Sequence, residues 1–475
     1  MAEKLSNRPA ERFRFERRDQ TLLLIMGDLV SALLALVVSL LIWAQGDTWL
    51  GLTIDFLRER IPVWFYFLPI LWMVLLVDSY DIRKTGNLRM TLRSLGLALL
   101  ASLGIYLVIY FASEPDSMPR VGVALFLILA AFFTLLWRLL YVRLFSSASK
   151  QKRALIIGAG RAGTALAEIV AEQDPPPFNL IGLIDDDPEK SGMTIQGFPV
   201  LGNHADLDEV IENYNITDLI LSISKEMHSG MFQTILAVQE NGMNLATMQD
   251  TYESLTNRIP ISLLESDWVI RSFIERTPTS GLYRLSKKIM DFILSLIGMV
   301  VLSILYPIIA ILIRLDSKGP IIFRQTRLGL RGEPYTIFKF RTMKDSQDME
   351  KEALVTSADD PRVTRVGSFL RKTHLDELPQ IANVLRGEMS FVGPRSERSE
   401  LVRVFQREVP FYRARMLVKP GITGWAQIHQ AYAETVEETA IKLEYDLYYI
   451  ENASILMDIS IMLRTVTAVL GFKGR

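Results

Sequence analysis

The chain of 475 residues contains no cysteine. Disulfide bonds, thiolate nucleophiles and cysteine-based zinc sites are therefore excluded. Histidine is scarce, and the spacing of the four histidines is not that of metal ligands: His204, His228, His374 and His429. No sign of charge dominates either, because the formal net charge is -1. This balance argues against a general nucleic-acid-binding protein.

Long apolar runs, in contrast, are abundant. Hydrophobic residues make up 49% of the chain, and four apolar runs lie at about residues 22–43, 61–77, 95–112 and 121–142. Their lengths are close to what is needed to cross a bilayer. The first run is too long for the core of a cleaved signal peptide and is interpreted as a signal anchor. We predict a basic tail over residues 1–20 and a four-helix transmembrane region over residues 21–143.

Basic residues alternate between the connections of these runs. Arginine and lysine are frequent in the tail, in the second connection and after the fourth run, whereas the third connection has only Arg120. Because cytoplasmic loops carry the excess of positive charge, the N-terminus and everything after residue 143 are predicted to be cytoplasmic. Asp28 is interpreted as a residue at the membrane interface rather than a functional one.

A buried-strand pattern at residues 153–157 runs into the glycine-rich sequence Gly158-Ala-Gly-Arg-Ala-Gly163. A second strand at residues 180–184 ends at Asp185, about where an acidic ribose ligand follows such a loop. The pattern predicts a Rossmann-like α/β domain over residues 150–265, with four candidate nucleotide-binding residues: Gly158, Gly160, Gly163 and Asp185. Alternatively, the glycines serve only the close packing of strand and helix, because a single glycine motif is weak evidence.

The apolar run at residues 289–313 is long enough to cross a bilayer. Basic residues nevertheless flank both ends: Arg284, Lys287 and Lys288 before, Arg314 and Lys318 after. Pro307 follows Tyr306 past the middle of the run and would break a helix there. We predict a re-entrant membrane helix over residues 289–313, broken at Tyr306 and Pro307, that enters and leaves by the cytoplasmic face.

The stretch Thr373-His-Leu-Asp-Glu-Leu-Pro-Gln380 predicts a helix, and its first turn contains Asp376 and Glu377, because Pro379 is tolerated only there. The N-terminus of a helix favours negative charge, so both carboxylates are expected to be ionised. Taken alone, such a pair is far more typical of an acidic helix cap than of a catalytic site.

Five other motifs accompany this stretch: Phe323–Gly329, Lys339–Met343, Asp359–Lys372, Gly387–Arg395 and Lys419–Trp425. With them, residues 281–475 closely resemble the polyprenyl-phosphate hexose-1-phosphate transferases, also called monotopic phosphoglycosyl transferases. The first 280 residues resemble the N-terminal extension of the large members of that family. Residues 281–475 are therefore predicted to form a catalytic domain of mixed α and β structure.

The resemblance implies that Asp376 attacks the β-phosphate of a UDP-hexose and releases UMP, leaving a sugar-phosphoryl aspartate. Polyprenyl (undecaprenyl) phosphate then takes the sugar phosphate. Glu377 would be the ligand of Mg²⁺ or Mn²⁺. Attack of one anion on another needs dense positive charge. The candidate phosphate-binding residues are Arg327, Lys339, Arg341, Arg371 and Arg395.

We therefore expect a multi-pass protein of the bacterial inner membrane with its catalytic domain in the cytoplasm. Its expected partners are the UDP-hexose, polyprenyl phosphate, the lipid bilayer and a second copy in a homodimer, and no nucleic acid. The reaction would initiate the synthesis of exopolysaccharide, capsule or O-antigen.

Two other functions stay open. Tyr283 and Lys287 fit the Tyr-x-x-x-Lys pattern of short-chain dehydrogenases. Together with the glycine loop they would suit an NAD-dependent nucleotide-sugar enzyme. The four predicted spans alone would suit a non-catalytic membrane scaffold for polysaccharide assembly, but a scaffold gives no reason for the acidic pair and the basic cluster to occur together.

Overall fold

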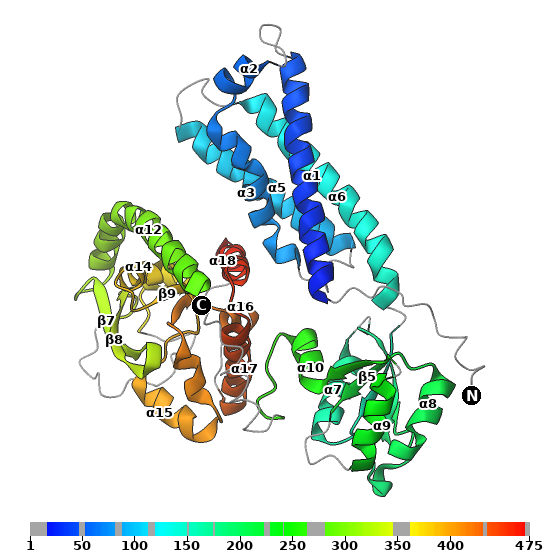
Figure 1. The fold of residues 1–475 in the computed structure, drawn as a ribbon. Coiled ribbons are helices and arrows are strands. Elements are labelled where there is room, and N and C mark those ends of the chain that lie inside the picture. Colours follow the sequence, from blue (N-terminus) through cyan, green and yellow to red (C-terminus); the bar gives the residue numbers. More distant parts are fainter. Residues whose placement is uncertain are drawn as a thin grey trace. The chain divides into compact units, whose positions relative to one another are not determined.

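The computed structural model describes residues 17–46, 53–80, 88–112, 119–149, 152–173, 176–222, 229–240, 242–263, 281–344, 362–430 and 435–470 (Figure 1). The chain divides into two compact units, Met1–Lys150 and Gln151–Arg475. Most of the predicted basic tail, and the predicted domain boundary near residue 265, lie outside the described residues.

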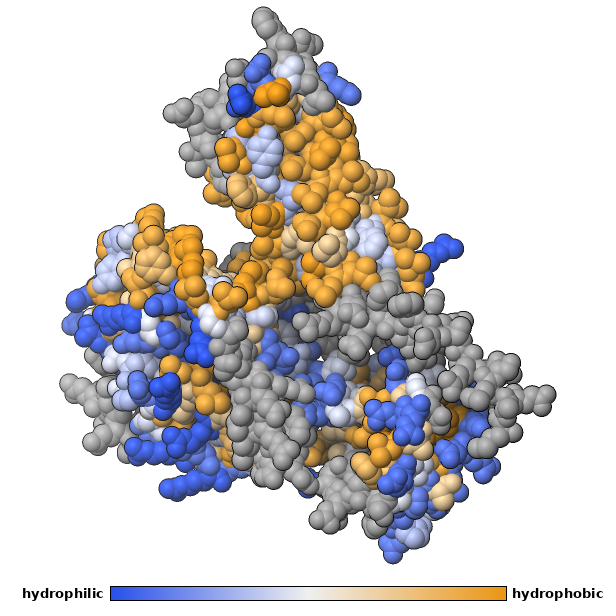
Figure 2. All heavy atoms as spheres, in the orientation of Figure 1, coloured by the Kyte–Doolittle hydropathy of each residue, from blue (hydrophilic) through white to orange (hydrophobic). Residues whose placement is uncertain are grey.

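All four apolar runs of the N-terminal unit form helices. The three long ones are α1 (Arg17–Gly46), α5 (Leu88–Ala112) and α6 (Arg120–Ser149). By length and composition these three could cross a membrane. The second run is divided into the 3₁₀ helices η2 (Val63–Phe67) and η3 (Val77–Tyr80) around α3 (Leu68–Leu75). A short helix, α2 (Ile54–Glu59), precedes it, and apolar residues cover most of this unit in Figure 2.

Asp28 is not an exposed interfacial residue. It is completely buried in α1, and its Oδ2 accepts a hydrogen bond of 2.6 Å from Arg138 Nη2 of α6. The same nitrogen donates to Ser79 Oγ of η3 at 2.6 Å. A charge inside a membrane bundle needs such a partner. The pair therefore joins three helical segments that are far apart in sequence.

A parallel four-stranded sheet with the order β2-β1-β5-β6 forms the first part of the second unit. Its strands are β1 (Arg153–Ile157), β2 (Asn179–Ile184), β5 (Asp218–Leu221) and β6 (Asn244–Thr247). The helices are α7 (Arg161–Glu172), α8 (Leu207–Tyr214), α9 (Ser229–Glu240) and α10 (Met248–Thr256), and a small hairpin joins β3 (Thr194–Ile195) to β4 (Phe198–Pro199). Apolar clusters bury both faces of the sheet, as is usual for parallel sheets. The predicted Rossmann-like fold is confirmed.

Contacts within the protein hold the glycine loop between β1 and α7. Gly158 has a φ of +104°, and a Cβ added to Gly163 would lie 1.9 Å from the carbonyl oxygen of Gly158. Asp185 Oδ2 accepts a hydrogen bond from Ala159 N at 2.6 Å, and Lys190 Nζ lies 3.1 Å from the same oxygen. These glycines serve close strand–helix packing. Nucleotide binding stays a prediction, and it would require Asp185 to exchange its partners.

The C-terminal part, residues 281–470, combines helices with two small sheets. It begins with α12 (Gly281–Asp316) and the antiparallel hairpin of β7 (Ile322–Leu328) and β8 (Pro334–Phe340). Further strands, β9 (Ser390–Val392) and β10 (Gly421–Thr423), pair in parallel. The other helices are α13 (Arg365–Lys372), η8 (Leu375–Gln380), α14 (Ile381–Leu385), α15 (Ser399–Glu408), η9 (Tyr412–Leu417), α16 (Trp425–His429), α17 (Val436–Asn452) and α18 (Ile455–Leu470).

Helix α12 is one continuous helix of 36 residues that passes through Tyr306 and Pro307, so the predicted break there is not an interruption of the helix. Its ribbon bends (Figure 1), as expected where proline removes a hydrogen bond and its ring crowds the preceding turn. The side turned away from the rest of the C-terminal part is apolar and exposed (Figure 2), as with Phe292, Ile297 and Ile304. Apart from α1, α5 and α6, it is the helix in the described residues that is long and apolar enough to cross a membrane.

Both ends of α12 are attached to the C-terminal part. Near the first end, Lys287 Nζ lies 2.8 Å from Asp458 Oδ2 of α18. At the other end, Asp316 Oδ2 accepts a hydrogen bond from Val366 N at 2.9 Å. A straight helix of this length would extend about 54 Å. Both ends of α12 contact the same part of the chain, so the helix is expected to bend rather than to extend straight over this length.

The segment after α10 joins the Rossmann-like part to the C-terminal part. Ile259 and Ile261 belong to the same buried cluster as Trp425 and Leu447. Trp425 Nε1 donates a hydrogen bond to Asn257 O at 3.1 Å. The segment after α10 thus packs into the apolar core of the C-terminal part.

Glu444 is buried in α17 beside the segment after α10, and its ionisation provides a test of this packing. Burial raises the pKa of Glu444 to about 7, although Arg258, 3.7 Å away, acts against the increase. The folded state therefore holds this proton more tightly than the unfolded state, whose pKa is 4.5, and stability falls as the pH rises from 4.5 to about 7. The fall is at most about 3 kcal/mol.

We expect Glu444→Gln to flatten this dependence, because glutamine does not titrate. Thermal unfolding of both proteins at about pH 5 and pH 8 measures it. A variant with the same difference between the two pH values as the wild type would contradict the assignment.

Candidate active site

The Thr373–Gln380 stretch forms the 3₁₀ helix η8, which continues into α14. His374, with a φ of +55°, turns the chain between α13 and η8. As predicted, Asp376 and Glu377 lie in the first turn. Ile381 and Val384 anchor α14 in the core. The local sequence thus places two adjacent carboxylates at the start of a short, buried helical segment.

Two cations from other segments bind Glu377. Its Oε1 accepts hydrogen bonds from Lys339 Nζ of β8 at 2.6 Å and from Arg395 Nη2 at 2.9 Å. Burial would raise the pKa of Glu377, but Arg395 and Lys339 outweigh burial and hold the pKa well below its ordinary value. Glu377 is therefore an anion at neutral pH. These contacts bring together residues from three of the sequence motifs: Lys339–Met343, Thr373–Gln380 and Gly387–Arg395.

Asp376 differs from its neighbour. Both side chains are 9% exposed, yet no described residue donates a hydrogen bond to the Asp376 carboxylate. Burial and the charge of Glu377 raise the pKa of Asp376, against the nearby cations. We expected the helix N-terminus to keep both carboxylates ionised, but the lowered pKa of Glu377 comes from Arg395 and Lys339, and burial raises the pKa of Asp376. A more basic and less solvated carboxylate is a stronger nucleophile once it is ionised.

Two other predicted phosphate-binding residues lie close to this pair. Arg371, in the last turn of α13, lowers the pKa of Asp376 through its charge, and its Nε donates to Thr342 Oγ1 at 2.9 Å. Arg327, in β7, lies near Arg395, and its Nη1 donates to Ser396 O at 3.0 Å. The cations at the site therefore come from four separate segments.

Arg341 lies apart from the carboxylates. Arg341 follows β8, which ends at Phe340. Arg341 Nη2 donates to Ser317 O at 2.8 Å, where the chain leaves α12. Arg341 thus contacts the residue that follows α12, and phosphate binding by Arg341 stays a prediction.

Close backbone contact between β9 and β10 positions Arg395. A Cβ on Gly421 would lie 2.1 Å from Gly393 N, and one on Gly424 would lie 2.2 Å from Gly393 O. Gly421 N also donates to Pro394 O at 2.9 Å. The glycines of these two motifs are needed because no side chain fits between the strands.

Sequence reasoning missed a buried ionic network behind Arg395. Glu397 Oε1 accepts a hydrogen bond from Lys442 Nζ at 2.7 Å and lies 3.7 Å from Arg415 Nη1. Arg415 Nη2 donates to the carbonyl of Arg395 at 3.0 Å and lies 2.8 Å from Asp446 Oδ2. Burial opposes ionisation, but Lys442 and Arg415 lower the pKa of Glu397 to about 2. The network fixes the backbone that carries Arg395.

The carboxylate pair fits a hard cation. Mg²⁺ is usually bound through one or two carboxylates, with substrate phosphates and water in the other positions. Both cation contacts of Glu377 use Oε1, so Oε2 is the oxygen that a metal ion would use. Across the described parts of the chain, no three histidine or acidic residues form a metal-binding group. The residues fit an ion shared with substrate, not an all-protein site.

Tyr283 and Lys287 have a structural role. Tyr283 OH donates to Asp458 Oδ2 at 3.2 Å, and Lys287 Nζ donates to the same oxygen at 2.8 Å. Nearby, Asp291 accepts hydrogen bonds from Ser390 Oγ and from Phe391 N. These contacts fix the start of α12, so the pair does not support a dehydrogenase.

Residues 282–472 match the family described as bacterial sugar transferase, and residues 76–244 match the one described as CoA-binding domain. The chain is 41% identical over 225 residues to a UDP-N-acetylgalactosamine-undecaprenyl-phosphate N-acetylgalactosaminephosphotransferase of Aeromonas hydrophila, covering 47% of this chain and 52% of the relative. It is 45% identical over 202 residues to the UDP-glucose:undecaprenyl-phosphate glucose-1-phosphate transferase of Escherichia coli K12, covering 42% of each.

A third relative is the exopolysaccharide production protein PSS of Rhizobium leguminosarum bv. phaseoli. It is 38% identical over 189 residues, which cover 39% of this chain and 94% of the relative. The chain spans about half the length of the first two relatives.

Proposed function

Because the chain belongs to the bacterial sugar transferase family, we propose that it transfers a hexose-1-phosphate from a UDP-hexose to polyprenyl phosphate and releases UMP. The observation that carries the proposal is that the two adjacent carboxylates have different surroundings. Glu377 is bound by Lys339 and Arg395, whereas Asp376 is buried beside them without a hydrogen bond from the described residues. Adjacent groups whose pKa values are moved apart are typical of different catalytic roles.

In the first step, a carboxylate oxygen of Asp376 bonds to the β-phosphorus of the UDP-hexose. The bond from that phosphorus to the bridging oxygen breaks, and UMP leaves with the electron pair. In the second step, a phosphate oxygen of polyprenyl phosphate attacks the same phosphorus and releases Asp376. A covalent intermediate suits one soluble and one membrane-bound substrate, because the two need never be bound together.

Lys339, Arg395 and Arg371 would neutralise the diphosphate as the aspartate approaches it. Glu377 holds the first two of these cations in place. When bound at Glu377, Mg²⁺ or Mn²⁺ would supply further positive charge to the substrate phosphates. The product would initiate exopolysaccharide, capsule or O-antigen synthesis at the cytoplasmic face of the bacterial inner membrane, and a homodimer stays a prediction.

UMP release from a panel of UDP-sugars tests the function. Without acceptor, we expect about one UMP per enzyme, because the covalent intermediate forms and stops. With undecaprenyl phosphate, release should become continuous. Release of UDP, or no release with any UDP-hexose and acceptor, would contradict the proposal.

The proposal also requires α12 to return to the cytoplasmic face. Its attachment at both ends to the C-terminal part, through Lys287 and Asp316, supports this re-entrant topology. Since the chain has no cysteine, single cysteines report the topology cleanly. We expect Ser286→Cys and Lys318→Cys, both at exposed positions, to be shielded from a membrane-impermeant thiol reagent in intact cells and labelled after permeabilisation. Labelling of Lys318→Cys alone from outside would mean that α12 crosses the membrane.

A further inference from the structure

A cavity with cationic walls adjoins the carboxylate pair. Arg327, Lys339 and Arg395 line it, together with Ile337, Gln380, Ser396 and Gly421. Lys339 and Arg395 also bind Glu377. These two cations therefore connect the cavity to the site of the chemistry.

Among the residues that line the cavity, Gln380 has a buried side chain whose amide nitrogen has no hydrogen-bond partner within the described residues. Its side chain is 2% exposed, and no group in the described structure accepts a hydrogen bond from its Nε2. A buried amide N–H without an acceptor is costly, so it calls for a functional explanation. This role could not be predicted from the sequence, because Gln380 lies in the same helical stretch as Asp376 and suits the packing of that stretch.

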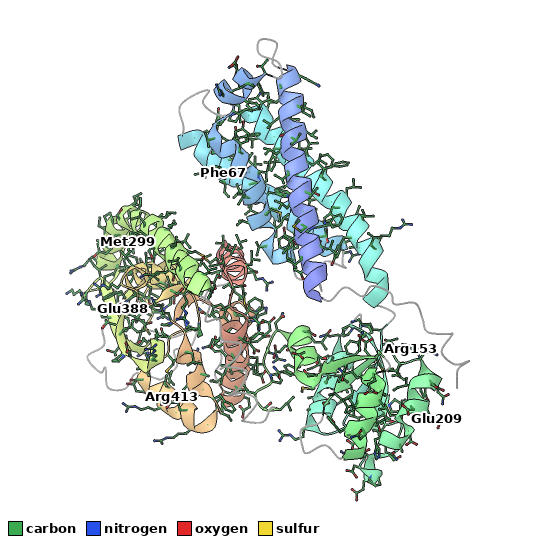
Figure 3. All side chains as sticks on the ribbon, in the orientation of Figure 1. Phe67, Arg153, Glu209, Met299, Glu388 and Arg413 are labelled. Carbon is green, nitrogen blue, oxygen red and sulfur yellow. The ribbon has the colours of Figure 1, made fainter. Side chains whose placement is uncertain are left out.

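The side-chain amide of Asn383, three residues later, is also buried, but protein groups accept and donate its hydrogen bonds. Its Nδ2 donates to Thr336 O and to Glu388 Oε2, both at 2.7 Å, and its Oδ1 accepts from Phe338 N at 3.2 Å. Figure 3 labels Glu388 in this region. All of these partners are protein groups. Gln380, which lines the cavity, has no such protein partner for its Nε2 among the described residues.

Positive charge is in excess at the cavity. Burial lowers the pKa of Arg327, and the charges of Arg395 and Arg398 lower it further, whereas Glu397 opposes this. A donor without an acceptor and three arginine or lysine side chains are the groups that an anionic oxygen ligand requires.

We propose that this cavity is a phosphate subsite on the leaving-group side of the reaction, and that Gln380 Nε2 donates a hydrogen bond to the bound phosphate. The inference rests on the proposed function for the identity of its ligands. In each displacement at phosphorus the attacking and leaving oxygens lie roughly in line. UMP therefore leaves from the side opposite Asp376, and polyprenyl phosphate must attack from that same side. The cavity binds the phosphate of UMP first and that of polyprenyl phosphate second.

The test compares the full-length wild type, Gln380→Leu and Asn383→Leu in nanodiscs. Dissociation constants for UMP, uridine and a short-chain polyprenyl phosphate are measured from the ligand-induced rise in melting temperature. For Gln380→Leu we expect binding of both phosphates to weaken about tenfold or more, since a hydrogen bond to a charged group is lost. Uridine, which has no phosphate, should bind both proteins equally.

The melting temperature without ligand separates this role from a packing role. Leucine is apolar and similar in size to glutamine, so Gln380→Leu removes an unsatisfied amide and should not lower the melting temperature. Asn383→Leu leaves its three protein partners without a hydrogen bond and should lower it, with both dissociation constants unchanged.

Unchanged binding of either UMP or the polyprenyl phosphate in Gln380→Leu would overturn the inference, and so would a fall in stability like that of Asn383→Leu. These measurements do not depend on turnover. Weakened binding of both phosphates, in a protein that transfers no sugar phosphate, would leave the subsite standing and overturn the proposed function instead.

Discussion

Asp376→Asn is expected to reduce transfer to less than about a hundredth of the wild-type rate, a barrier increase of more than ~3 kcal/mol. The amide has the shape of the carboxylate but is not a nucleophile. No hydrogen bond from the described residues depends on the carboxylate of Asp376, and its charge is repelled by Glu377. The variant should therefore fold with unchanged or higher stability. UMP release and the melting temperature are the two measurements.

Asp446→Asn is the matched control. Asp446 is another buried aspartate, 2.8 Å from Arg415 in the network behind Arg395. Loss of its charge leaves Arg415 partly uncompensated and should lower the melting temperature. If Asp376→Asn keeps more than a hundredth of the activity, or loses stability as Asp446→Asn does, Asp376 is not the nucleophile.

Glu377→Gln is expected to cause the second large loss, of activity and of stability together. The carboxylate compensates Lys339 and Arg395, and removal of one member of a buried ionic group costs roughly 3–5 kcal/mol. Because the pKa of Glu377 is held low, this contribution is present at neutral pH and is lost only as the pH falls through and below the ordinary value of 4.5. The variant should therefore unfold at a lower temperature than the wild type at pH 7, and the difference should shrink in acid.

Removal of metal tests the other role of Glu377. We expect excess EDTA to stop UMP release by the wild type, and Mg²⁺ or Mn²⁺ to restore it. EDTA should leave the melting temperature nearly unchanged, because the described residues provide two adjacent carboxylates rather than a closed metal site. Full activity in excess EDTA would rule out the metal.

The sequence predicts those parts of the site in which residues close in sequence carry the signal. Pro379 places Asp376 and Glu377 in a first helical turn, and Lys339, named as a candidate phosphate-binding residue, contacts Glu377. The paired glycines were recognised through the resemblance, and the structure supplies the reason: Gly393 and Gly421 allow two strands to touch.

Features that depend on contacts between residues far apart in the sequence could not be predicted in this way. Asp28 reads as interfacial until Arg138, 110 positions later, is seen beside it. Arg341 continues the alternation of its strand, but the strand ends one residue earlier and the side chain turns to Ser317. The pKa of Asp376 is likewise set by burial in the tertiary structure, which outweighs the local preference of a helix N-terminus for a charged carboxylate.

In the proposed mechanism, Asp376 carries the sugar phosphate between the two substrates. Its most direct test is the intact mass of the wild type after incubation with a reactive UDP-hexose and Mg²⁺ but no acceptor. We predict a gain of one hexosyl phosphate, located at Asp376 by peptide mapping, absent in Asp376→Asn and lost when polyprenyl phosphate is added. An unmodified protein that nevertheless releases UMP once acceptor is present would mean direct transfer between the substrates, and would contradict the account.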